Sequence, residues 1–125
     1  MESSRVRTFQ DLIVWQKAHA LTLNVYQAAR KFPSDEKYGI ISQMRRAAYS
    51  VPSNIVEGHS RRSKREFGQF LSIAAASLSE LRYFMILSRD LGHINLEEYE
   101  KLYQNAEEVG RILYSFTRSL NASRL

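Results

Sequence analysis

Residues 43–58 read Gln43-Met44-Arg45-Arg46-Ala47-Ala48-Tyr49-Ser50-Val51-Pro52-Ser53-Asn54-Ile55-Val56-Glu57-Gly58, and this stretch decides the fold. Its apolar residues step by three and four positions, the spacing of one core-facing helix stripe. That stripe comprises Ile41, Met44, Ala48, Val51 and Ile55. A polar stripe with the same spacing lies roughly 140° away around the helix. It comprises Gln43, Arg46, Ser50, Asn54 and Glu57.

The polar stripe is short-chained and rich in amides and hydroxyls, unlike an ordinary solvated face of Lys and Glu. We therefore expect it to contact a neighbouring helix or a second subunit, with Glu80 as the partner of Arg46. Arg46→Ala is then expected to disturb assembly more than ligand binding. Pro52 removes one backbone donor and crowds the carbonyl four residues before it. The hydroxyls of Ser50 and Ser53 are the expected partners of the freed groups.

Three further stretches show helical spacing, and capping residues set their limits. The predicted helices cover residues 9–32, 34–57, 64–91 and 96–120. Their expected caps are Thr8 with Asp11, Ser34, Ser63 with Glu66, and Asn95 with Glu98, while Gly58 and Gly92 suit the position after a helix end. Four such helices with short loops predict an all-α, antiparallel, up-down-up-down bundle. Residues 1–125 form one domain, with flexible tails over 1–8 and 121–125.

Composition narrows the class of protein. The 125 residues contain no cysteine, which excludes disulfides, thiolate metal sites and thiol nucleophiles. Residues 1–8 lack the apolar segment of a secretory signal. The longest apolar run, residues 70–91, is interrupted by Glu80 and Arg82, so we expect a buried or interfacial helix and no membrane span. The expected location is the cytoplasm.

Positive charge is concentrated in the first half of the chain. The net charge is +5, and residues 1–65 carry 12 Lys/Arg against 5 Asp/Glu. Four cations lie within five residues of the second connection: Arg61, Arg62, Lys64 and Arg65. Such a cluster suits phosphate contacts, which depend on charge and not on base sequence. Arg45, Arg46 and Lys37 are expected to extend the patch; the alternative is a solvated linker.

No catalytic constellation is evident. His19, His59 and His93 fall on different segments without metal-ligand spacing, and the Glu-x-x-His pairs of di-iron bundles are missing. Phosphate-binding loops and hydrolase motifs are missing as well. We therefore predict no enzyme, no catalytic residues, no metal and no cofactor. Aromatic residues do not interleave with the basic loop, so base stacking there is not supported.

Some apolar residues lie beyond the predicted core stripes: Ile73, Phe84, Tyr103 and Tyr114. A lone bundle would expose them, which favours a homo-oligomer.

The chain resembles the bacterial four-helix bundle family of 23S rRNA intervening-sequence proteins. The resemblance rests on residues 43–58, on Phe9-x-Asp11-Leu12-x-x-Trp15-Gln16-x-Ala18, on Phe32-Pro33 and Tyr38-Gly39, and on Arg65-Glu66-Phe67-x-x-Phe70-Leu71 with the residues up to Leu81. It implies association into homopentameric barrels and supplies no catalytic residue. Accessory proteins of diversity-generating retroelements are similar in fold; they bind nucleic acid through a basic surface and associate with a reverse transcriptase.

Two hypotheses follow. The first is a non-enzymatic homo-oligomer, expected to be a pentamer, that binds structured RNA or DNA through the basic loop. The second is a protein-interaction scaffold, for example an accessory partner of a reverse transcriptase, that makes no nucleic-acid contact.

Overall fold

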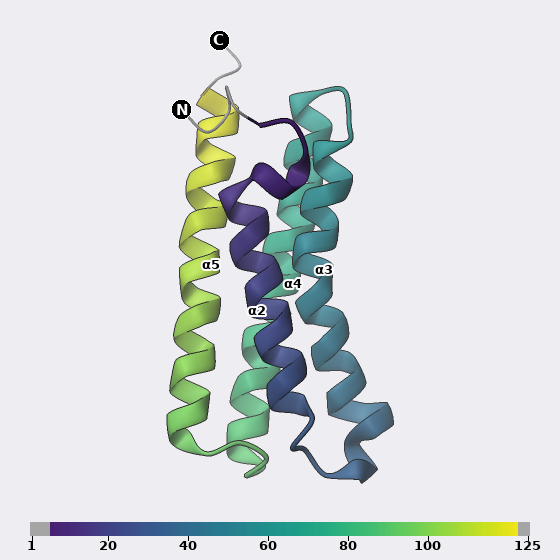
Figure 1. The fold of residues 1–125 in the computed structure, drawn as a ribbon, viewed down its shortest axis with the longest axis vertical. Coiled ribbons are helices and arrows are strands. Elements are labelled where there is room, and N and C mark those ends of the chain that lie inside the picture. The colour runs from purple at the N-terminus through teal and green to yellow at the C-terminus, as the bar shows by residue number, and fades with distance from the viewer. Residues whose placement is uncertain (1–5, 123–125) are drawn as a thin grey trace.

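The computed structural model describes residues 6–122, which form four long helices and three short helical turns (Figure 1). In chain order they are η1 (Phe9–Asp11), α2 (Ile13–Ala29), η2 (Ser34–Glu36), η3 (Lys37–Ile41), α3 (Ser42–His59), α4 (Lys64–Asp90) and α5 (Leu96–Ala122). Successive long helices run in opposite directions, and the described residues contain no strand. The predicted all-α four-helix fold is confirmed.

The predicted apolar stripe of α3 lies in the core. Met44, Val51 and Ile55 are completely buried, and Ala48 is nearly so. They belong to the single apolar core of the bundle, in which α3 packs against α4 and α2. Because burial of such side chains is the main driving force of folding, this stripe fixes how α3 is rotated within the bundle.

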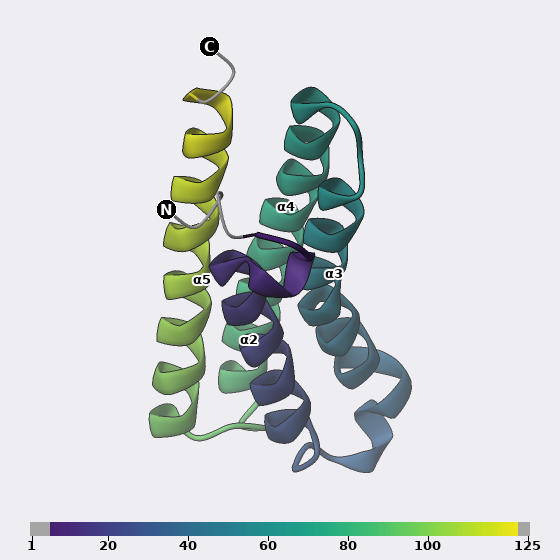
Figure 2. The same ribbon diagram turned by 45° about the horizontal axis from the view of Figure 1, so that its top comes forward.

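The first predicted helix is interrupted near its start. Thr8 and Asp11 form the expected capping box, but it caps the 3-10 turn η1. Leu12 then adopts an extended conformation, with φ −78° and ψ 124°, and α2 begins only at Ile13. Figure 2 shows η1 lying across the beginning of α2. Predicting one continuous helix from Phe9 was therefore wrong, whereas α2 ends at Ala29, before Pro33 as expected.

The second predicted helix is also divided. Gly39 has φ −110° and ψ −113°, outside the helical region, and separates η2 and part of η3 from α3. Ser34 does not act as the expected N-cap: it lies within η2, and Pro33 holds the cap position without a side-chain bond. The regular helix begins at Ser42 and continues through Pro52.

Gly58 has a different role from the one predicted. It lies inside α3 and is buried, and does not follow the helix end. A Cβ atom built there would lie 2.6 Å from Cδ1 of Phe67 and 2.9 Å from Cβ of Phe70, both on α4. Gly58 is therefore required because α3 and α4 approach each other closely, and not for its backbone freedom.

Pro52 is accommodated by a contact that the sequence did not reveal. The Ala48 carbonyl, which a residue-52 N–H would normally bind, lies 3.1 Å from Oγ1 of Thr22 on α2. The single proton of this hydroxyl is shared between the Ala48 carbonyl and the Ala18 carbonyl of its own helix, which lies 2.9 Å away. Ser50 had been expected to help here, but its hydroxyl lies 2.8 Å from that of Ser77 on α4. Asn54 donates through Nδ2 to the carbonyl of Ser50 at 2.7 Å. Polar contacts thus join α3 to both neighbouring helices.

The remaining helix ends largely follow the sequence. Ser63 accepts from the Glu66 N–H, Asn95 accepts from the Glu98 N–H, and Gly92 has φ +78° after α4. These caps are confirmed. α5 continues to Ala122, so Asn121 and Ala122 are helical and do not belong to the expected tail. Residues 1–5 and 123–125 of the predicted tails lie outside the described residues.

We expect Gly58→Ala to destabilise the fold by about 1–3 kcal/mol, because the new methyl group overlaps Phe67 and Phe70. Chemical denaturation measures this difference in the free energy of unfolding. Gly68→Ala is the matched control: it lies in α4 with nothing within 4 Å of the added Cβ. It should leave stability unchanged or raise it by up to about 1 kcal/mol. Equal losses in the two variants would contradict the close-approach explanation.

Thr22→Val should cost about 1–3 kcal/mol, because it removes the hydroxyl that the Ala18 and Ala48 carbonyls share and leaves the Ala48 carbonyl without a partner. Pro52→Ala restores an N–H at residue 52, so the same Thr22→Val change should cost less in that background. A double-mutant cycle of unfolding free energies measures the coupling. Strict additivity would show that the two residues act independently.

Candidate functional site

One end of the bundle is strongly basic. The α3–α4 connection and the last turns of α5 lie at the same end (Figure 1). Residues 6–20, 50–76 and 109–122 make up this half of the bundle and contain eight Lys/Arg against three Asp/Glu. The other half, residues 21–49 and 77–108, contains eight against nine. We call the first half the basic end. The fold therefore separates charge along the bundle axis.

The four predicted loop cations lie together at the basic end and are exposed. Arg61 is partly engaged: NH2 lies 3.6 Å from Oε2 of Glu57, and the guanidinium sits 4.7 Å from the ring centre of Phe70. Arg62 and Arg65 form no ion pair with any residue between 6 and 122. Arg111 and Arg118 of α5 are also exposed at this end, and the sequence reasoning missed them because they are distant in the chain.

Arg45 does not extend the loop patch. It precedes Arg61 by 16 residues, which corresponds to roughly 24 Å along a helix. Its guanidinium lies 4.8 Å from the ring centre of Tyr26, and its Nε is buried without a hydrogen-bond partner among the described residues. Arg46 and Lys37 lie in the same distant half. The structure thus brings together the four loop residues and separates the three others from them.

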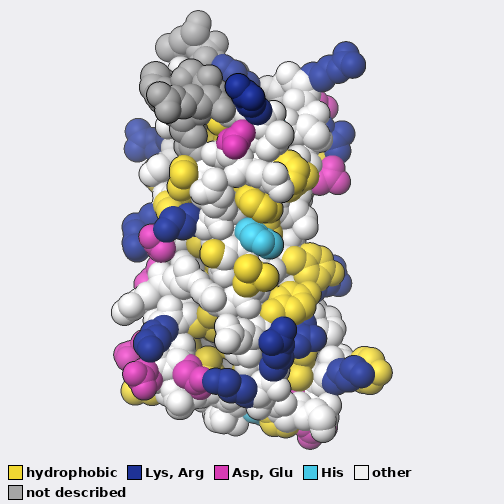
Figure 3. Space-filling view, viewed as in Figure 1, with side chains coloured by type: hydrophobic (Ala, Val, Ile, Leu, Met, Phe, Trp, Pro, Cys, Tyr) yellow, Lys and Arg dark blue, Asp and Glu magenta, His cyan; other side chains and the backbone are white. Residues whose placement is uncertain are grey.

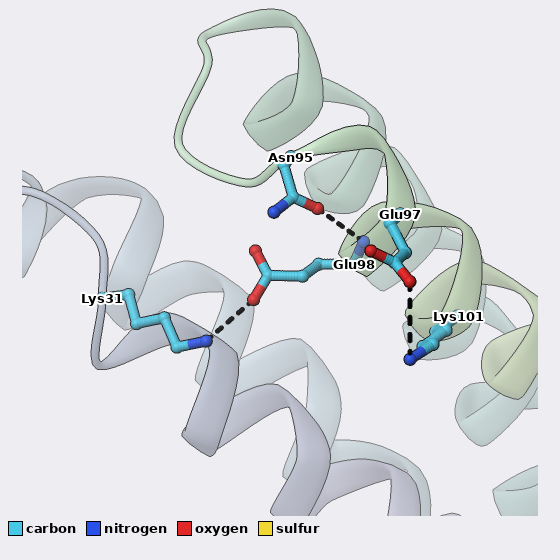
Figure 4. Close-up of polar contacts among 5 residues, drawn as sticks. All are labelled: Lys31, Asn95, Glu97, Glu98 and Lys101. Carbon is cyan, nitrogen blue, oxygen red and sulfur yellow. Dashed lines mark hydrogen bonds and ion pairs between the residues drawn. The ribbon is translucent and has the colours of Figure 1, made fainter.

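At the opposite end, acidic groups are paired with cations (Figure 4). Lys31 lies 2.8 Å from Oε2 of Glu98 and lowers the pKa of that carboxyl. Glu97 and Lys101 form a longer pair at 4.0 Å. His93 Nε2 lies 2.9 Å from Glu36, and this hydrogen bond lowers the pKa of Glu36. These contacts join the α4–α5 turn to η2 and α2, so this end is tied together and has little net charge.

The polar stripe of α3 divides into two groups. Ser50 and Asn54 contact each other, and Ser50 contacts Ser77 of α4, while Gln43, Arg46 and Glu57 are exposed. Glu80 is exposed on α4, and within this chain it forms no ion pair with Arg46. The first group therefore lies between helices of one chain. In the second group Glu57 pairs with Arg61 of the same chain, and contacts of Gln43 and Arg46 with a second subunit remain a prediction.

α4 carries an exposed stripe that reaches beyond the bundle core. Ile73 is 49% exposed and Tyr83 56%, with Ala76 and Glu80 at intervening helical positions. By length and composition alone, α4 is the one described helix that could cross a membrane, and only 28% of its most apolar window is buried. Tyr114 is exposed as expected. Phe84 and Tyr103 are only partly exposed, because they pack against the core.

A groove between α2 and α3 was also missed. It has a volume of about 430 Å³. Its α2 wall carries Trp15, His19, Leu23 and Tyr26, and its α3 wall carries Tyr49, Ser53 and Val56. Figure 3 shows a histidine among hydrophobic side chains on this face. Trp15, His19, Leu23 and Tyr26 follow one another on α2 at intervals of four, four and three residues, and this spacing was a usable signal.

The described residues contain no group of three His, Asp or Glu side chains that could hold a metal ion.

The comparisons with known proteins agree with this fold. The model of the 23S rRNA-intervening sequence protein family matches residues 10–115, nearly the whole bundle. The chain belongs to this family. No curated protein matches it. Among solved structures, this intervening-sequence protein is similar to a protein with unknown function from the S23 ribosomal protein family of Bacteroides thetaiotaomicron, with a TM-score of 0.78 and 23% identity. The similarity covers 84% of this chain and 98% of that one, and it shows a shared fold.

Proposed function

We propose that this family member is a non-enzymatic homo-oligomer that binds structured RNA or DNA through its basic end. The single observation that supports this is the separation of charge along the bundle, with eight Lys/Arg against three Asp/Glu at one end. Clustered, exposed cations attract phosphate backbones and release their counterions. Arg62 and Arg65 are the best-placed contacts, since neither forms an ion pair in the described chain.

Self-association would cover the exposed stripe of α4. We propose that a second copy of the chain, and not lipid, packs against this stripe of α4, because Glu80 and several serines interrupt its apolar surface. Gln43 and Arg46 are exposed on α3, whose Ser50 contacts α4 through Ser77, and could supply polar contacts beside it. A ring, proposed as a pentamer, would repeat the basic end around its axis and make weak binding multivalent.

A scaffold that meets an acidic protein partner, such as a reverse transcriptase, is the second candidate. Exposed apolar residues on α4 are the observation that favours it. In this arrangement the acidic protein partner, and not nucleic acid, would bind to the basic end. Both candidates place the protein in the cytoplasm.

Replacing Arg61, Arg62, Lys64 and Arg65 by Ala should weaken binding of a structured RNA and reduce its salt dependence. Each lost phosphate contact lowers the slope of log K against log salt by about 0.7–0.9. Fluorescence anisotropy across a salt series measures both quantities. Lys37→Ala/Lys101→Ala removes two cations from the other end and is the control. The proposal fails if the wild-type protein does not bind at low salt, or if the loop variant binds as the wild type does.

Ile73→Glu should reduce the mass of the oligomer, because it places a charge in the proposed interface between copies. Multi-angle light scattering after gel filtration measures the mass. Leu96→Ser is the control, since Leu96 is 62% exposed at the first residue of α5 and lies outside the proposed interface. An unchanged mass for Ile73→Glu, or a monomeric wild type, would remove this part of the proposal.

A further inference from the structure

Five aromatic rings that sequence analysis did not bring together line the α2–α3 groove: Phe9, Trp15, His19, Tyr26 and Tyr49. Trp15 and His19 are stacked, with ring centres 4.9 Å apart and planes inclined by 8°. Tyr26 lies further along the same helix, and Tyr49, which is 46% exposed, faces them from α3. Pro52 forms part of the lining between the two walls. Aromatic side chains therefore line both walls of one groove, with one ring face of Trp15 covered by His19 and one of Tyr26 covered by Arg45.

The groove has the polarity of a site for a planar, polar-edged ring. No carboxylate lines it, whereas the imidazole of His19 and the hydroxyls of Tyr49 and Ser53 can donate or accept hydrogen bonds. Arg45 stacks on Tyr26 beside it, with its buried Nε lacking a partner in the described chain. A volume of about 430 Å³ is within the usual range for small-ligand pockets.

The groove also leads toward the basic end. Val56 lines it on α3 and precedes Arg61 by five residues, a rise of roughly 8 Å. A nucleic-acid strand with one base in the groove could therefore place neighbouring phosphates near the loop cations. Stacked aromatic residues next to a positively charged path are the usual features of single-strand binding sites.

We infer that the α2–α3 groove binds an unpaired nucleobase by stacking on its aromatic side chains, so that the protein prefers looped or single-stranded segments over continuous duplex. This inference rests on the proposed function, because the phosphates of the same strand are held by the basic end. In this arrangement the groove contacts the nucleobase and the loop cations contact the phosphates.

Trp15 is the only tryptophan of the chain, so its fluorescence reports on this groove alone. The probe is an unstructured 12-nucleotide uridine strand, compared with a duplex of the same length and with an abasic strand carrying the same phosphates. We expect saturable change of Trp15 fluorescence with the uridine strand only. His19→Ala and Tyr49→Ala should each weaken its binding about tenfold, the size expected for one lost stacking contact, while duplex binding changes less than twofold. Tyr38→Ala, 87% exposed outside the groove, is the matched control.

The outcomes separate the two proposals. If the duplex and both strands bind equally, through the loop cations and without fluorescence change, the proposed function stands and the nucleobase site is wrong. If no nucleic acid binds, both are wrong. If Tyr49→Ala instead lowers the oligomer mass in light scattering, the groove is an interface between copies and the inference is overturned. The wild-type comparison of uridine and abasic strands decides the matter even where a variant fails to fold.

Discussion

The close approach of α3 and α4 is the constraint on which the rest of the structure depends. Gly58 leaves no room for a side chain against Phe67 and Phe70, and the Ser50 and Ser77 hydroxyls meet across the same contact. Once these helices are joined, the apolar stripe of α3 faces the core and the loop between them is fixed at one end of the bundle. Small residues therefore determine where the large positive charges lie.

Much of the fold could be predicted from helical spacing, because burial requires a continuous apolar stripe on each helix. The breaks at Leu12 and Gly39 could not, since each depends on how η1 or η2 packs against other helices. The role of Gly58 was misread for a similar reason: a glycine near a helix end fits a cap and a close contact equally well, and only the position of α4 distinguishes them.

The candidate site was predictable where its residues are neighbours in the chain. Four cations in the 61–65 loop must lie together whatever the fold. Arg111 and Arg118 lie at the same end only because the antiparallel α5 returns to it, whereas Arg45 is separated from the loop by the length of α3 itself. The aromatic groove required knowledge of how α2 and α3 are rotated toward each other. Sequence reasoning thus located the charges and missed the surface formed between helices.

The hydrogen bond from Thr22 to the Ala48 carbonyl has an evolutionary consequence. A proline at position 52 is tolerated in the middle of α3 because Thr22 of α2 donates to the Ala48 carbonyl, which would otherwise lack a hydrogen-bond donor. Loss of the hydroxyl alone leaves a buried acceptor unsatisfied, whereas loss of the proline first makes the hydroxyl dispensable. The order of substitution at these two positions therefore matters. If the proline is replaced first, the threonine can be replaced at little cost in stability. If the threonine is replaced first, the single variant is less stable.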